Sequence, residues 1–277
     1  MTINCRGQLL DLSTPKVMGI LNVTPNSFYD GGQFQKEKEI RNQVEKMLTE
    51  GASFIDVGAY SSKPNAEYVS EAEEVSRMLP IVQLLQKHFP EALLSIDTFR
   101  SEVAKVALDH GAAMINDISA GNLDVQMMST IAAYQVPYCM MHMKGTPQTM
   151  ATLAQYENIV NEMLFYFSEK VAQARSHGIN DLLLDPGFGF AKTMDQNYEV
   201  LQKMEVLQFL ELPILVGVSR KSMVHQVLSS NAQEALNGTT VLNTLALTKG
   251  AKILRVHDVK EAVECIQLFD KMNSTKS

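Results

Sequence analysis

The sequence predicts an α/β protein folded as a single (β/α)8 TIM barrel, and two observations carry this prediction. Eight short apolar runs, rich in β-branched residues, each end in polar residues, and amphipathic helical patterns lie between them. No linker, low-complexity segment or block of charge interrupts the series. Eight strand–helix units in roughly 250 residues is the number that closes such a barrel. The domain is expected to span 1–277, with 1–15 as a short lead-in and 271–277 as a frayed tail.

The eight expected strands can be placed by their apolar runs. They are 17–22, 53–58, 92–97, 113–117, 137–142, 181–185, 213–218 and 252–257. The first strand leads into a loop, 23–32, which contains Pro25, Asn26 and the Gly31–Gly32 pair. Such residues favour turns over regular structure, so this loop is expected to stand at the end of the strand and to order over a bound ligand.

The expected helices show apolar residues three and four positions apart. These patterns cover 40–48, 75–85, 103–107, 160–167, 200–207, 241–245 and 259–269. Four glycines, Gly51, Gly111, Gly178 and Gly250, stand where helix C-caps are expected. A doubly wound open sheet is the alternative architecture. It often has a glycine-rich first turn, and neither GxGxxG nor GxxxxGK[ST] occurs in the sequence.

Composition limits the class of protein. Apolar residues make up 45% of the chain and charged residues 20%, which suits a soluble globular protein with a substantial core. The net charge of −7 gives no basic field for nucleic acid or an anionic membrane. Three widely spaced cysteines, a polar N-terminus and the lack of a long apolar run predict a cytoplasmic protein with reduced thiols and no membrane span.

The polar residues at the strand ends predict the position of the active site. In this barrel the site lies at the carboxyl ends of the strands, and every second residue of a strand faces the same side. Several such rows change from apolar to polar toward their ends: Met18-Ile20-Asn22, Leu93-Ser95-Asp97, Leu183-Asp185, Leu215-Gly217-Ser219 and Ile253-Arg255-His257. We therefore expect a pocket lined by polar side chains.

Basic residues gather after the last two strands. Arg255 and His257 share one row, and Arg220 and Lys221 follow the seventh strand. Loops in this position commonly bind phosphate in these barrels, so a phosphorylated ligand is expected. The alternative is that these cations pair with local carboxylates on the surface.

A second group of polar residues suits a flat, nitrogen-rich heterocycle. The carboxylates of Asp97 and Asp185 can each accept paired N–H bonds, and the amide of Asn116 can donate and accept at once. The alternative is a set of buried carboxylates neutralised by Lys221.

The remaining candidates are a metal ligand, some aromatic residues and a histidine. An amide oxygen such as that of Asn22 is a reasonable Mg²⁺ ligand beside a diphosphate, with Asp56 as a second or outer partner. Phe188, Phe190 and Phe28 stand near the expected mouth, either against an aryl substrate or as caps on the barrel rim. His142 is interpreted as a structural residue of the pocket wall. No HExxH motif, Ser/His/Asp order or Cys/His pair indicates hydrolysis or covalent catalysis.

Motifs at successive strand ends make the sequence resemble the dihydropteroate synthase family. They are MGILNVTP, DVG followed by SSKP, SIDT, INDIS, MMHMKGTPQTM, LLLDPGFGF, GVSRKSM and RVHDV, in that order. Each motif is weak alone, and together they are specific. The resemblance implies a (β/α)8 enzyme of folate synthesis. It would join (7,8-dihydropterin-6-yl)methyl diphosphate to 4-aminobenzoate with Mg²⁺, and it implies a cytoplasmic homodimer that sulfonamides inhibit.

The resemblance also implies residue roles. Asp97, Asn116, Asp185 and Lys221 would hold the pterin, Asn22 the magnesium, and Arg255 and His257 the diphosphate. The aminobenzoate site would be lined by Ser62, Lys63, Pro64, Phe190, Ser219 and Arg220. Catalysis would rest on Asn22, Asp97, Lys221, Arg255 and His257, which stabilise charge as diphosphate leaves before the amine attacks.

Some positions depart from the family pattern. Ala59 and Tyr60 stand where glycine and glutamate are usual, Ser62 and Lys63 replace threonine and arginine, and Asn26 replaces aspartate. Two other functions remain open. A methyltransferase that uses methyltetrahydrofolate shares the fold and pterin pocket but needs no diphosphate site. A pterin-binding paralogue without activity is the second.

Overall fold

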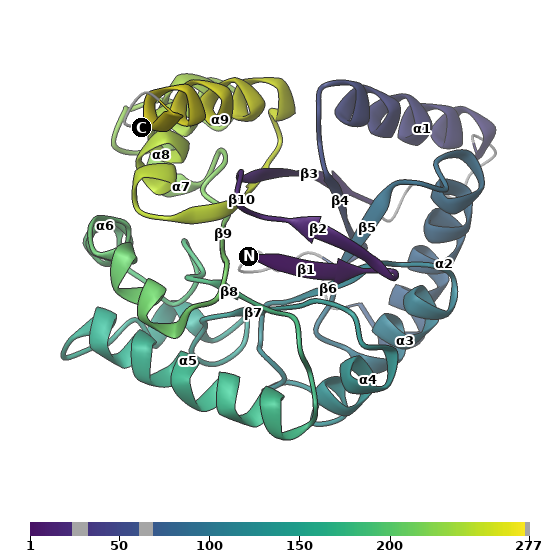
Figure 1. Ribbon diagram of the computed structural model, residues 1–277, viewed down its shortest axis with the longest axis horizontal. Coiled ribbons are helices and arrows are strands. Elements are labelled where there is room, and N and C mark those ends of the chain that lie inside the picture. Colours follow the sequence, from purple (N-terminus) through teal and green to yellow (C-terminus); the bar gives the residue numbers. More distant parts are fainter. Residues whose placement is uncertain (24–32, 61–68, 275–277) are drawn as a thin grey trace.

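The computed structural model describes residues 1–23, 33–60 and 69–274. Eight parallel strands form a closed barrel in the order β10-β3-β4-β5-β6-β7-β8-β9, and helices surround it (Figure 1). The barrel strands are β3 (Lys16–Asn22), β4 (Phe54–Gly58), β5 (Leu93–Asp97), β6 (Met114–Asp117), β7 (Tyr138–Met141), β8 (Leu182–Asp185), β9 (Ile214–Val216) and β10 (Ala251–Val256). The predicted (β/α)8 fold is confirmed, and each barrel strand lies within or next to its expected range.

Helices follow the strands in the expected alternation. The α-helices are α1 (Gln33–Thr49), α2 (Glu71–His88), α3 (Ser101–Asp109), α4 (Met127–Tyr134), α5 (Ile159–Ser176), α6 (Met194–Gln202), α7 (Ser222–His225), α8 (Leu236–Thr248) and α9 (Val259–Ser274). Two 3₁₀ helices, η2 (Met150–Thr152) and η3 (Met204–Leu210), complete the set. Within the described residues no helix is long and apolar enough to cross a membrane.

Three helical features differ from the sequence prediction. The apolar pattern over 200–207 predicted one helix, whereas α6 ends at Gln202 and η3 continues as a tighter 3₁₀ helix. Helices α4 and α7 were not predicted, because their runs, MMSTIAAY and SMVH, are too short to show a clear helical repeat. Helix α9 extends to Ser274, so residues 271–274, which were assigned to the tail, are helical. The four predicted C-cap glycines all adopt positive φ angles, between 83° and 101°.

The lead-in forms a hairpin that closes one end of the barrel. Strands β1 (Thr2–Cys5) and β2 (Gln8–Asp11) pair antiparallel and lie across the amino-terminal end of the barrel (Figure 1). The buried side chains of Ile3, Cys5 and Leu12 pack on an inward-facing layer of the barrel strands. This layer consists of Met18, Phe54, Met114, Cys139, Leu183, Leu215 and Ile253. The hairpin was not predicted from the sequence, and it confines the polar interior to the opposite end.

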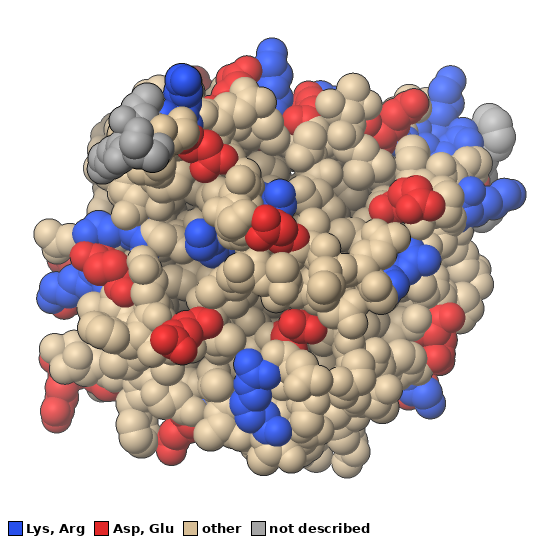
Figure 2. All heavy atoms as spheres, viewed as in Figure 1, with Lys and Arg blue, Asp and Glu red and all other residues tan. Residues whose placement is uncertain are grey.

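Most of the core lies between the barrel and its helices. The outward-facing strand residues, such as Ile55, Ile96 and Leu184, pack against the apolar faces of the surrounding helices. All three cysteines are buried and free, in keeping with the prediction of reduced thiols. On the face shown in Figure 2, Lys and Arg side chains are interspersed with Asp and Glu side chains.

Candidate active site

Arg255 lies at the centre of the polar end of the barrel. Its side chain projects inward from β10, and two of its N–H groups donate to carboxylates from neighbouring strands. Nε lies 2.6 Å from Oδ2 of Asp56, and Nη2 lies 2.7 Å from Oδ2 of Asp97. Asp56 is fully buried, so its ion pair with Arg255 is shielded from water. One guanidinium therefore fixes the geometry of two carboxylates that come from β4 and β5.

Asp97 is the more accessible of the two carboxylates, and its proton affinity is high. Its side chain is 19% exposed, whereas that of Asp56 is 0% exposed. Burial raises the pKa of Asp97 to about 7; Arg255 opposes the rise and the Asp56 carboxylate adds to it. Two carboxylates share one cation here, so protonation of Asp97 near neutral pH relieves their repulsion.

Asn116 and Ser95 extend this polar layer. Asn116 pairs in register with Asp97, and its Nδ2 donates to Oδ2 of Asp56 over 3.3 Å. Ser95 pairs in register with Asp56, and both side chains are fully buried. Oδ1 of Asp56 and Oγ of Ser95 have no hydrogen-bond partner in the described structure. Buried polar atoms of this kind are ready to bind a ligand or an ordered water.

Asp185 and Lys221 form the next part of the ring. Oδ1 of Asp185 accepts a hydrogen bond from the backbone N–H of Gly187 over 2.7 Å. Burial raises the pKa of Asp185, and the ammonium of Lys221 opposes the rise. Burial also lowers the pKa of Lys221 to about 8. Nζ of Lys221 donates to the carbonyl of Phe188 over 2.6 Å and lies 4.9 Å from the centre of the Phe190 ring.

Two inward-facing glycines leave room above the polar layer. A Cβ atom on Gly58 would lie 3.6 Å from Cβ of Asp97 and 3.8 Å from Oδ1 of Asn22. A Cβ atom on Gly217 would lie 3.9 Å from both Arg255 and Nζ of Lys221. These are ordinary contact distances, so a methyl group would fit the backbone but would occupy space between the functional side chains.

Ser219 and His257 stand together at the ends of β9 and β10. Oγ of Ser219 lies 3.1 Å from Nδ1 of His257 and accepts the backbone N–H of His257 over 3.2 Å. His257 is exposed to solvent while Ser219 is buried. The hydroxyl thereby orients the imidazole ring at the carboxyl end of the barrel.

The side chain of Arg220 forms an ion pair with Asp258. Its Nε and Nη2 donate to the two carboxylate oxygens of Asp258 over 2.9 Å and 2.6 Å, and Nη1 donates to the carbonyl of Ala232. This paired geometry is the strong form of an Arg–carboxylate contact. In this conformation the guanidinium of Arg220 ties the β9 loop to the start of α9.

Asn22 ends β3 with its side chain exposed near Gly58 and Asp97. In the described residues, no group of three or more His, Cys, Asp or Glu side chains is arranged to enclose a metal ion. A single amide oxygen beside a carboxylate suits Mg²⁺ because this ion keeps several waters and takes few protein ligands. Asp56, which was expected beside the metal, is buried and paired with Arg255 instead.

Some expected positions lie outside the described residues, namely Ser62, Lys63, Pro64, Asn26 and Phe28. Tyr60, the last described residue before the gap at 61–68, has a defined position. Its hydroxyl accepts a hydrogen bond from Nε2 of Gln148 over 3.1 Å, and its ring meets the ring of Phe99 edge-on at 5.3 Å. Tyr60 therefore contacts the loop after β5 and the loop after β7.

The aromatic residues and His142 have separate places. Phe188, which was expected at the mouth, is fully buried in the core instead, whereas Phe190 is partly exposed. His142 is 2% exposed and packs against the rings of Tyr156 and Tyr166. Burial, with the nearby Lys192 and Lys144, lowers the pKa of His142 to about 2, so it is neutral. This supports the structural interpretation of His142.

Two members of the site were missed or underrated at the sequence level. The sequence suggested Asp56 only as a partner of the metal. Yet Phe54-Asp56-Gly58 is a row of alternate strand residues like those that predicted the polar pocket. Lys192 was not considered because it stands in a loop. No spacing in the sequence indicates that its ammonium lies beside three backbone carbonyls.

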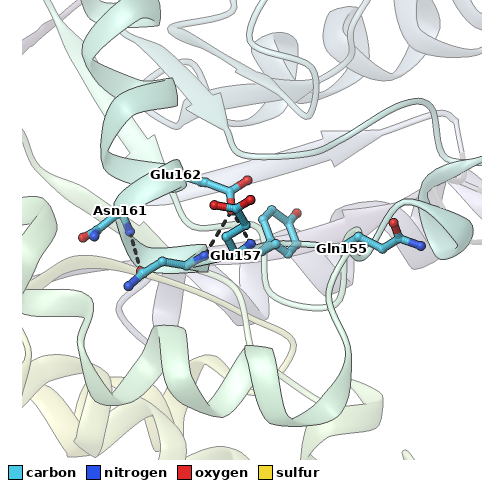
Figure 3. A pocket seen from close by; sticks show the side chains of 6 residues that line it. Gln155, Glu157, Asn161 and Glu162 are labelled. Atoms are coloured by element: carbon cyan, nitrogen blue, oxygen red, sulfur yellow. Dashed lines mark hydrogen bonds between the residues drawn. The ribbon is translucent and has the colours of Figure 1, made fainter.

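A surface pocket of about 620 Å³ lies away from this ring, around the start of α5. It is lined by Gln155, Tyr156, Glu157, Asn158, Asn161 and Glu162 (Figure 3). Oε1 of Glu162 accepts the backbone N–H groups of Glu157 and Asn158 over 2.8 Å and 3.2 Å. Its Oε2 lies 3.0 Å from the ammonium of Lys144. Glu162 therefore caps the helix start, and none of the sequence-predicted site residues lines this pocket.

Comparisons with known proteins show the family to which the chain belongs. A family model described as pterin binding enzyme matches residues 18–257. The dihydropteroate synthase of Escherichia coli (strain K12) is 40% identical, over 100% of this chain and 98% of that protein.

Solved structures agree as well. The structure of the Yersinia pestis dihydropteroate synthase with a sulfonamide drug complex superposes with a TM-score of 0.92 at 40% identity, covering 99% of this chain and 100% of that one. The Xanthomonas albilineans dihydropteroate synthase with 4-aminobenzoic acid gives a TM-score of 0.90 at 33% identity, covering 98% of both chains. The chain therefore belongs to the dihydropteroate synthase family of pterin-binding enzymes.

Proposed function

We propose that the ring of side chains at the barrel mouth joins (7,8-dihydropterin-6-yl)methyl diphosphate to 4-aminobenzoate, giving 7,8-dihydropteroate and diphosphate. The enzyme is an alkyl-group transferase of folate synthesis. The observation that carries the assignment of residues is the ion pair of Arg255 with Asp56 and Asp97, which places cation and carboxylates at one pocket floor.

The pterin would lie on Asp97, Asn116, Asp185 and Lys221. The carboxylates can accept N–H bonds from the aminopyrimidinone edge, and the Asn116 amide can both donate and accept. The high pKa of Asp97 fits this role because a bound pterin supplies N–H donors that compensate the buried charge. Lys221, held by the Phe188 carbonyl, would donate to a ring acceptor and balance Asp185.

The diphosphate would lie on Arg255 and His257, next to Asn22. A guanidinium has five N–H groups, and two of those of Arg255 donate to Asp56 and Asp97 in the structure. The same group can therefore hold a phosphate oxygen while it keeps both carboxylates in place. Asn22 would hold Mg²⁺, which when bound supplies charge that stabilises the departing diphosphate.

The reaction would proceed with departure of diphosphate before attack by the amine. The methylene group between pterin and diphosphate becomes cationic, and Asp97 and Asp185 stabilise that charge through the pterin. Arg255 and His257 stabilise the negative charge on the leaving group. The aromatic amine is a nucleophile in its neutral form, so no strong general base is required. Electrostatic stabilisation is thus the main contribution of the chain.

The aryl substrate would lie against Phe190 and Ser219. Ser62, Lys63, Pro64 and Arg220 complete the proposed aminobenzoate site; the first three lie outside the described residues. Arg220 is paired with Asp258, so it would act by shaping the β9 loop or by exchanging partners on binding. The relative solved with 4-aminobenzoic acid supports this choice of substrate.

Sulfonamide competition tests the aryl site. Sulfonamides resemble 4-aminobenzoate, and a relative has been solved with a sulfonamide drug complex. In steady-state assays of dihydropteroate formation, a sulfonamide is expected to raise the KM for 4-aminobenzoate without changing kcat. A fall in kcat at saturating 4-aminobenzoate, with KM unchanged, would place the drug elsewhere and contradict the proposed site.

The chain would act as a homodimer in the cytoplasm. Exposed apolar side chains gather on neighbouring elements at one side of the barrel: Val227, Leu228, Val241, Leu245, Leu268 and Met272, between 47% and 74% exposed. An apolar patch of this kind favours burial against a second copy. Sedimentation is expected to give a dimer for the parent and a monomer for Leu245→Glu. A monomeric parent at micromolar concentration would exclude this assembly.

A further inference from the structure

The loop between β8 and α6 begins directly after Asp185 and contains Phe190, and its backbone is held in an unusual conformation. Gly187, Gly189 and Ala191 all adopt positive φ angles, of 69°, 81° and 47°. A positive φ is unfavourable for a residue with a side chain such as Ala191. A Cβ atom on Gly187 would lie only 2.2 Å from the carbonyl oxygen of His142, so the loop passes very close to the end of β7.

The ammonium of Lys192 binds at this junction. Its Nζ donates to the carbonyls of Gly187 over 2.9 Å, Phe190 over 3.0 Å and His142 over 3.3 Å. An ammonium group has three N–H donors, so each donor meets one backbone carbonyl. The three acceptors come from two positions of the β8 loop and from the end of β7. Lys192 therefore joins two barrel segments at the edge of the pocket.

The charge of Lys192 also acts on the pocket. Nζ of Lys192 donates to three backbone carbonyls, which carry no net charge. These hydrogen bonds therefore do not neutralise the positive charge of the ammonium. Among the charged groups that influence it, Asp185 favours the ammonium and Lys221 opposes it. Burial lowers the pKa of Lys192 to about 7, so the ammonium is the main form below neutral pH. His142, beside it, is neutral.

The backbone that Lys192 binds carries residues proposed to contact the substrates. The backbone N–H of Gly187 donates to Oδ1 of Asp185, and the Phe190 ring lies beside the ammonium of Lys221. Movement of the loop would therefore displace a pterin-binding carboxylate and the wall of the aryl site together. Lys221 and, to a smaller extent, Lys192 lower the pKa of Asp185, so loss of the Lys192 charge would make Asp185 easier to protonate.

We propose that Lys192 is a positioning residue. It fixes the β8 loop so that Asp185 and Phe190 present one geometry to both substrates. The proposal rests on the function proposed above, because that function assigns Asp185 to the pterin and Phe190 to the aminobenzoate.

Two variants separate the hydrogen bonds from the charge. Lys192→Met keeps the length of the apolar stem and removes both donors and charge, whereas Lys192→Gln keeps two N–H donors without charge. Lys203→Met, a change at an exposed lysine paired with Glu199 at the end of α6, is the matched control. All variants are compared by thermal melting, by steady-state kinetics from pH 5 to 9 and by calorimetry with 6-hydroxymethylpterin.

For Lys192→Met we expect a folded protein whose KM for each substrate and Kd for the pterin rise about tenfold or more, as for the loss of hydrogen bonds from a charged group. The acid limb of kcat/KM should move to higher pH in both Lys192 variants, because Asp185 loses a stabilising cation. Lys192→Gln should recover part of the KM change and none of the shift in pH. Lys203→Met should match the parent.

The proposal is overturned if Lys192→Met keeps the KM values and pH profile of the parent within about twofold. It is also overturned if neither Lys192 variant folds, because Lys192 would then be a stability residue. A parent that binds pterin but forms no dihydropteroate would instead contradict the proposed function. The calorimetric comparison of the Lys192 variants would still measure the positioning effect in that case.

Discussion

The ionised carboxylate of Asp97 is proposed to bind the pterin, but its burial makes the fold less stable. It lies beside Asp56 and is compensated by a guanidinium that both carboxylates share. Its pKa of about 7 is well above its ordinary value of 3.8, so the folded chain binds a proton at Asp97 more tightly than the unfolded chain does. Between these two pH values, raising the pH ionises Asp97 in the unfolded chain while the folded chain keeps its proton, so the free energy of unfolding falls.

Asp97→Asn should therefore compare more favourably with the parent in free energy of unfolding at high pH than at low pH. We expect the stability of the variant, relative to the parent, to rise between pH 5 and pH 8 by at least about 1.4 kcal/mol, which corresponds to one pKa unit. Urea unfolding at both pH values measures the difference. Glu91→Gln, at an exposed position, is the control and should show no such change. A relative stability that falls between pH 5 and pH 8 would contradict the high pKa.

The same substitution tests the pterin site. Removing the charge weakens hydrogen bonds worth about 1.5–3 kcal/mol, so the affinity for a pterin should fall roughly ten- to a hundredfold at pH 8. Titration calorimetry with 6-hydroxymethylpterin gives this affinity directly. An unchanged Kd would remove Asp97 from the pterin site.

Gly217 tests the space above the polar layer. A methyl group there would lie 3.9 Å from Arg255 and from Nζ of Lys221, so Gly217→Ala should fold with a stability within about 1 kcal/mol of the parent. It should still weaken pterin binding, because the methyl group would stand between these two cations, where the pterin is proposed to bind. Ser168→Ala, on an exposed part of α5, is the control. Parent-like binding by Gly217→Ala would show that the ligand does not use this space.

At the scale of elements, the β1–β2 hairpin determines which end of the barrel is open. Leu12 is fully buried against the barrel floor, whereas Leu9 on the same hairpin is 74% exposed. Leu12→Ala should lower the free energy of unfolding by about 2–5 kcal/mol, and Leu9→Ala should change it by less than about 0.5 kcal/mol. Chemical denaturation of both variants checks the difference. Equal effects would mean that the hairpin does not close the barrel in solution.

His142 at the end of β7 should make the fold sensitive to acid. Its pKa is lowered from 6.5 to about 2 by burial and by the nearby lysines, so the unfolded chain binds a proton there that the folded chain does not. Stability therefore falls as the pH drops below 6.5. Between pH 7 and pH 5 this single group should remove about 2 kcal/mol.

The His142→Gln variant should lack this part of the acid sensitivity, whatever its absolute stability. The measurement is the change in unfolding free energy between pH 7 and pH 5, compared with the parent. His177→Gln, at an exposed position, serves as the control. If parent and His142→Gln lose stability in parallel, His142 is not held neutral.

At the scale of the whole molecule, the barrel could be predicted from the sequence because its signals are local. A buried strand such as Phe54–Gly58 shows its inward and outward residues by simple alternation, and the order of eight units determines the topology. The hairpin could not be predicted in the same way. Its strands have only four residues each. The burial of Ile3 and Cys5 depends on the barrel residues that they cover, which the local sequence does not show.

The site was predictable in part for the same reason. Polar strand ends indicated Asp97, Asn116, Asp185 and Arg255, but not their partners. Arg255 binds carboxylates that are 199 and 158 positions away in the chain, and such pairing depends on barrel closure. Lys192 is an ordinary loop lysine in the sequence, and only the fold brings its ammonium to the end of β7.

Diphosphate release is the measurement that tests the central claim most directly. The chain is supplied with (7,8-dihydropterin-6-yl)methyl diphosphate and Mg²⁺, with and without 4-aminobenzoate, and diphosphate and dihydropteroate are quantified together. The account predicts that both products form in equal amounts when 4-aminobenzoate is present, and that Arg255→Gln slows this turnover far more than it weakens binding of 6-hydroxymethylpterin. Equal losses of turnover and pterin affinity, or no dihydropteroate from the parent, would contradict it.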